Sequence, residues 1–150
     1  MKNLLSVALI TVIVLSSLVF VNNVIASTSV TGIIYSDATW TKVNSPYVFE
    51  GPVAVNSGVT LTIEPGVTIN VNDHYLQING TLNALGADND KINFNCGSII
   101  FTSVSSGGSI QNAVLSDSIS VSVSVKITKN SIHELDVNGG SSAISHNSMT

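Results

Sequence analysis

A six-residue segment near the end of the chain recurs at a fixed spacing, and this repeat constrains the fold more than any other feature. Residues 127–132, Ile-Thr-Lys-Asn-Ser-Ile, return as residues 144–149, Ile-Ser-His-Asn-Ser-Met, so each position recurs 17 residues later (144 against 127). A looser copy, Asn112-Ala113-Val114, precedes Asn130-Ser131-Ile132 by 18 residues (130 against 112). Such a period in a β-rich chain is typical of a solenoid whose repeats stack in parallel. We expect Asn130 and Asn147 to form a structural ladder at its turns.

Apolar and polar residues alternate in short runs from Val53 onward, which is typical of half-buried strands. The longest run places Ile119, Val121, Val123, Val125 and Ile127 on one side and serines with Lys126 on the other. Asn-Gly pairs, which are typical of tight hairpins, occur only at Asn79-Gly80 and Asn138-Gly139, and the strands beside the first pair are short. The pattern therefore favours a coil over antiparallel hairpins, with five or six short turns.

Residues 1–26 have the features of a secretory signal peptide. Lys2 provides the positive charge, residues 4–21 are mostly apolar, and Val24-Ile25-Ala26 is a suitable cleavage site. An uncleaved membrane anchor is the alternative, because the apolar run is about long enough to span a bilayer. We expect residues 27–52 to form an N-terminal cap segment, in which Trp40 and Tyr47 cover the first turn rather than stack on a sugar. Residues 53–150 then form the coil.

The charge of the chain argues against nucleic acid as a partner. Without Lys2, four lysines and no arginine face nine acidic residues, which gives a net charge of −5 (four minus nine). The sequence shows no cluster of basic residues that would bind a phosphate backbone. Cys96 is the only cysteine, so no disulfide can form within the chain. We expect its side chain to be a small buried hydrophobe in a strand.

The stretch from Trp40 to Phe94 resembles secreted right-handed parallel β-helix proteins of the pectate-lyase-like superfamily. The resemblance is strongest at residues 60–67, Thr-Leu-Thr-Ile-Glu-Pro-Gly-Val, and continues through Gly80-Thr81-Leu82 and Lys91-Ile92-Asn93-Phe94. It implies an all-β fold, a right-handed parallel β-helix, and a secreted or cell-surface location. Glu64-Pro65-Gly66 suits a tight corner between strands, because Pro fixes one dihedral angle and Gly permits a positive φ.

The catalytic patterns of enzymes in that superfamily are largely missing. The chain has no Asp-Asp pair for hydrolysis and no arginine to abstract a proton, so we predict no catalytic residue and no metal site. Four acidic residues are weak candidates for binding: Asp88, Asp90, Glu134 and Asp136. Asp88-Asn89-Asp90 offers too few oxygens for a complete calcium shell, so we expect no cofactor beyond a weak calcium site.

These features predict a non-catalytic extracellular or cell-surface β-helix scaffold that binds carbohydrate or envelope proteins. The alternative is the N-terminal part of a polysaccharide lyase or glycoside hydrolase whose catalytic turns lie beyond this chain. The sequence stops just after a repeat, at Thr150. We therefore expect an incomplete coil at the C-terminus, where an open strand edge favours self-association.

Overall fold

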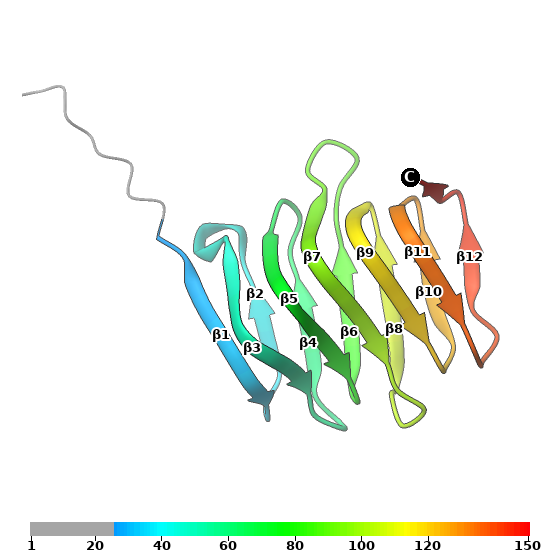
Figure 1. Ribbon diagram of the computed structural model, residues 1–150, viewed down its shortest axis with the longest axis horizontal. Coiled ribbons are helices and arrows are strands. Elements are labelled where there is room, and N and C mark those ends of the chain that lie inside the picture. Colours follow the sequence, from blue (N-terminus) through cyan, green and yellow to red (C-terminus); the bar gives the residue numbers. More distant parts are fainter. Residues whose placement is uncertain (1–25) are drawn as a thin grey trace, which may run out of the picture.

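A computed structural model describes residues 26–150, which form a single coil of parallel strands (Figure 1). All of the assigned signal peptide except Ala26 lies outside these residues. Within the described part, no helix is long and apolar enough to cross a membrane. The only helical element assigned there is a short 3-10 turn, η1 (Lys42–Asn44).

Two parallel sheets make the walls of the coil, and successive strands alternate between them. The seven-stranded sheet contains β1 (Thr28–Ile34), β3 (Tyr47–Val55), β5 (Thr68–Ile78), β7 (Ile92–Phe101), β9 (Ala113–Val121), β11 (Ser131–Val137) and β13 (Ser148–Met149). The six-stranded sheet contains β2 (Ala38–Trp40), β4 (Thr60–Ile63), β6 (Thr81–Leu85), β8 (Gly107–Gln111), β10 (Val125–Thr128) and β12 (Ala143–Ser145). Six turns result, from β1–β2 to β11–β12, which confirms the all-β, parallel β-helix class.

The 17-residue repeat sets the register of the last turns. Ile127 pairs with Ile144 and Ser131 with Ser148, as the repeat predicts. The 18-residue spacing predicted from the looser copy is wrong by one residue, because Ser131 pairs with Val114, which is 17 residues away. Asn112 therefore lies one position before the equivalent of Asn130.

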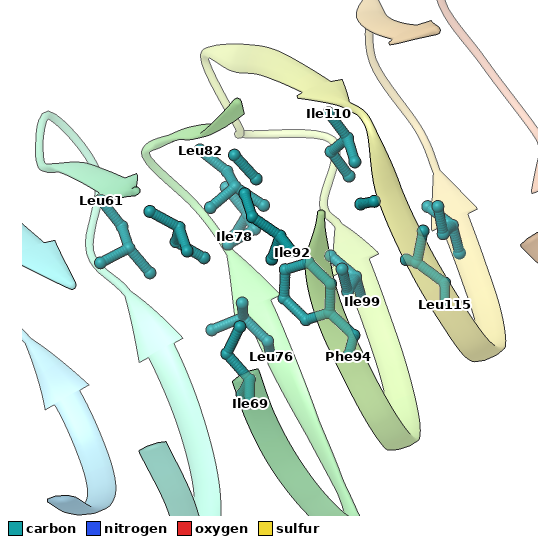
Figure 2. Packing of buried hydrophobic residues seen from close by; sticks show 14 of the residues in the cluster. Leu61, Ile69, Leu76, Ile78, Leu82, Ile92, Phe94, Ile99, Ile110 and Leu115 are labelled. Carbon is teal, nitrogen blue, oxygen red and sulfur yellow. The ribbon is translucent and has the colours of Figure 1, made fainter. Parts of the chain in front are cut away.

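The core consists of inward side chains stacked from turn to turn (Figure 2). In the larger sheet, Ile69, Phe94 and Leu115 occupy one column, and each is at most 3% exposed. Leu61 and Leu82 stack in the same way on the opposite sheet. Stacking apolar side chains on one another removes nearly all of their surface from water, and this burial stabilises the coil through the hydrophobic effect.

The alternating run from Ile119 to Ile127 turns a corner instead of forming one strand. β9 ends at Val121 and β10 begins at Val125, so the two halves of the run belong to different sheets. The apolar residues of the run nevertheless face the core as predicted, because four of the five are buried and Val123 packs against the core.

The larger sheet has a register irregularity in each strand pair from β1–β3 to β9–β11. Bulges of this kind bend a strand and turn side chains outward. At this bend Asn72 and Asp73 in β5 and Cys96 in β7 have positive φ, 52°, 59° and 52°. Cys96 is consequently exposed, and the expectation of a buried cysteine is wrong.

Residues 27–52 contain β1, β2 and the beginning of β3, which pair in parallel with the strands after them. Trp40 and Tyr47 stack with their ring centroids 4.7 Å apart. Both rings are buried inside the first two turns, at 6% and 3% exposure, so neither offers a face on which a sugar could stack.

Candidate binding groove

Four corners of the coil lie one above the other along one of its edges. Each corner leads from the six-stranded sheet to the next strand of the seven-stranded sheet. Strand register places one residue from each corner at an equivalent position, namely Lys91, Asn112, Lys129 and His146. The last three have positive φ values of 50°, 58° and 56°. A residue in the left-handed region bends the chain sharply. Because these three φ values are alike, the three corners have the same tight bend. Adjacent turns are about 4.8 Å apart, as in any sheet.

An asparagine ladder holds these corners from the inside. Asn130 Oδ1 accepts a hydrogen bond from Ala113 N (2.8 Å), and its Nδ2 donates to Ile110 O (2.9 Å). Asn147 repeats both bonds one turn later, with Asn130 N (2.9 Å) and Ile127 O (2.9 Å). The predicted ladder is thus confirmed, although the left-handed residue is the one before each asparagine.

An open groove of about 410 Å³ lies over these corners. Its lining combines hydrogen-bonding groups with charges: Asp88, Lys91, Asn112, Lys129, Asn130, Ser131, His146 and Ser148. These residues come from consecutive turns, so the groove follows the axis of the coil. Basic side chains from three corners share this lining, although the chain as a whole has a formal net charge of −4.

Asp88 contributes a carboxylate to the groove from the β6–β7 loop, which extends beyond the neighbouring corners (Figure 1). Its Oδ1 lies 3.7 Å from Lys129 Nζ. The two side chains are 76% and 54% exposed, so water screens their attraction strongly.

Asp90, in the same loop, has a structural role instead. Both of its carboxylate oxygens lie 2.7 Å from Lys42 Nζ. Its backbone exchanges two hydrogen bonds with Ala87 and accepts a third from Gly66 N (3.0 Å). Gly66 has a φ of 76° in the tight corner after Pro65, so Asp90 fastens the loop to that corner.

Glu134 and Asp136 lie on the outer face of β11 and do not line the groove. They pair in register with Ser118 and Ser120 of β9. Asp136 Oδ2 accepts a hydrogen bond from Asn138 Nδ2 (2.6 Å). The four acidic candidates therefore lie in three different surroundings, and only Asp88 faces the groove. Among residues 26–150, no three His, Cys, Asp or Glu side chains are grouped to hold a metal ion.

Sequence reasoning missed the basic residues of the groove. Lys129 and His146 were visible as equivalent positions of the 17-residue repeat, but that repeat was interpreted only as scaffold. Lys91 belongs to a turn with a different length, so no repeat pointed to it.

Comparisons of the chain with protein-family models, curated proteins and solved structures found no match.

Proposed function

We propose that the chain is a secreted or cell-surface β-helix module that binds an acidic carbohydrate in the groove, without cleaving it. The observation that carries this proposal is the column of basic side chains, Lys91, Lys129 and His146, in an otherwise hydrogen-bonding groove. Ammonium groups attract carboxylates and sulfates, and the neighbouring hydroxyl and amide groups are suited to sugar hydroxyls.

The direction of the groove supports a linear ligand. Its lining residues recur from turn to turn along the axis of the coil, so a chain lying along it would meet similar groups at each step. The resemblance of residues 40–94 to secreted β-helix proteins supports the extracellular location and a carbohydrate ligand.

A binding role without cleavage agrees with the acidic residues of the groove. Glycoside hydrolases generally require two carboxyl groups on either side of the scissile bond. Among the residues that line the groove, Asp88 is the only carboxylate.

The test is calorimetric titration of the full chain with an oligogalacturonate and with a neutral galactan oligosaccharide of the same length. We expect binding of the acidic sugar only, and a loss of at least about tenfold in affinity for K129Q, since a hydrogen bond to a charged group contributes about 1.5–3 kcal/mol.

K126Q is the matched control for this test. Lys126 is exposed on β10 outside the groove, so its replacement makes the same charge change elsewhere. Equal losses in K126Q and K129Q, or no binding by the wild type, would reject the groove. Release of unsaturated sugars would show a lyase instead.

A further inference from the structure

The β6–β7 loop carries two aspartates whose surroundings differ sharply. Asp90 is held by Lys42 at 2.7 Å and by backbone hydrogen bonds on both sides, so its carboxylate belongs to the scaffold. Asp88 lies at the tip, more exposed, and approaches Lys129 only to 3.7 Å. The first contact fastens the loop, and the second leaves a carboxylate free to move.

We infer that Asp88 is an internal counter-ion that competes with the ligand for Lys129 and thereby lowers the affinity of the groove for acidic sugars. This inference rests on the proposed function, because it concerns the same groove. The Asp88 carboxylate has the chemistry of the group that the ligand would present, and it already faces one of the ammonium groups that would bind that ligand.

The contact is weak enough to be displaced. Exposed ion pairs contribute about 0–1 kcal/mol, so an incoming carboxylate with additional hydroxyl contacts can replace that of Asp88. Asp88 would still repel the ligand after displacement, since it stays tethered at the groove. Both effects weaken acidic ligands and leave neutral ones unaffected, so Asp88 sets the selectivity of the groove as well as its affinity.

The experiment compares D88N with the wild type, using the full chain and the same two oligosaccharides at low and high salt. We expect D88N to bind the oligogalacturonate about two- to fivefold more tightly at low salt, and the gain to shrink as salt screens the charges. E134Q removes one negative charge from the outer face of β11, away from the groove, and should leave the affinity unchanged.

Equal affinity of D88N and wild type would overturn the inference while leaving the proposed function intact. A similar gain in E134Q would also overturn it, because the effect would then come from net charge alone.

If no variant binds, the proposed function fails and the inference with it, and the Cε chemical shift of Lys129 then tests only the contact between Asp88 and Lys129. K129Q identifies this signal in protein labelled with ¹³C-lysine. A shift that D88N changes and E134Q does not would support the internal contact between Asp88 and Lys129. A shift unchanged in D88N would overturn it.

Discussion

Each asparagine of the ladder at the groove corner hydrogen-bonds two backbone groups of the preceding turn. Asn130 is 2% exposed, and it bonds Ala113 N and Ile110 O at the corner where the chain passes from one sheet to the other. A buried backbone group without a partner costs free energy, so this side chain acts as part of the backbone network.

We therefore expect N130A to lower the free energy of unfolding by about 2–4 kcal/mol, because it leaves one donor and one acceptor unpaired in the interior. Urea unfolding followed by far-ultraviolet circular dichroism measures the loss. N147A removes the same two bonds at a more exposed corner, where water can replace them, and should cost about 1 kcal/mol. Equal losses in the two variants would contradict the importance of burial.

At the scale of elements, β8 depends on a close approach that only glycine allows. Gly108 pairs with Leu82 of β6, and a Cβ atom at Gly108 would collide with the Leu82 carbonyl group. Its φ of 144° is also one that L-residues rarely adopt. β8 can stack on β6 only while this position lacks a side chain.

G108A should consequently lower the free energy of unfolding by at least about 3 kcal/mol, measured by the same denaturation. G58A is the matched control. Gly58 also has positive φ, 78°, but nothing lies within 4 Å of an added Cβ, so only backbone strain of about 1–2 kcal/mol remains. A loss in G108A no greater than in G58A would show that β8 shifts to accommodate the methyl group.

The elements also show how far the sequence alone can predict this fold. Alternation identified which side of residues 119–127 faces the core, because burial depends on the same period of two in either sheet. It could not find the corner at residues 122–124, because the side-chain alternation continues through that turn. Cys96 was misplaced for a related reason, since a bulge reverses the side on which the residue lies.

At the scale of the whole molecule, the groove is formed by residues that lie above one another in consecutive turns, and not by residues that are neighbours in the sequence. Lys91 and Lys129 are separated by two complete turns along the chain, yet they line one groove. The acidic candidates Glu134 and Asp136 are close in sequence, but strand geometry places them outside the groove. Only Asp88 was both expected from sequence and found there.

The coil should also open unevenly, because each turn contacts only its neighbours. β5 and β7 are covered on both sides and contain fully buried residues, whereas every residue of β12 and β13 is exposed. We expect amide hydrogens in β12 and β13 to exchange at least about tenfold faster than those in β5 and β7, as measured by mass spectrometry. Uniform rates would indicate that the coil opens as one unit.

The expected difference in exchange rate between these strands also provides a test of the proposed binding. His146, on the corner between β12 and β13, and Ser148, the first residue of β13, line the groove in the part of the coil that should exchange fastest. A ligand that binds only the folded groove stabilises whatever must be ordered to form it. Saturating oligogalacturonate should therefore slow exchange in β11 to β13 and leave β1 to β4 unchanged. Equal slowing throughout, or none near residues 146–148, would contradict binding at these corners.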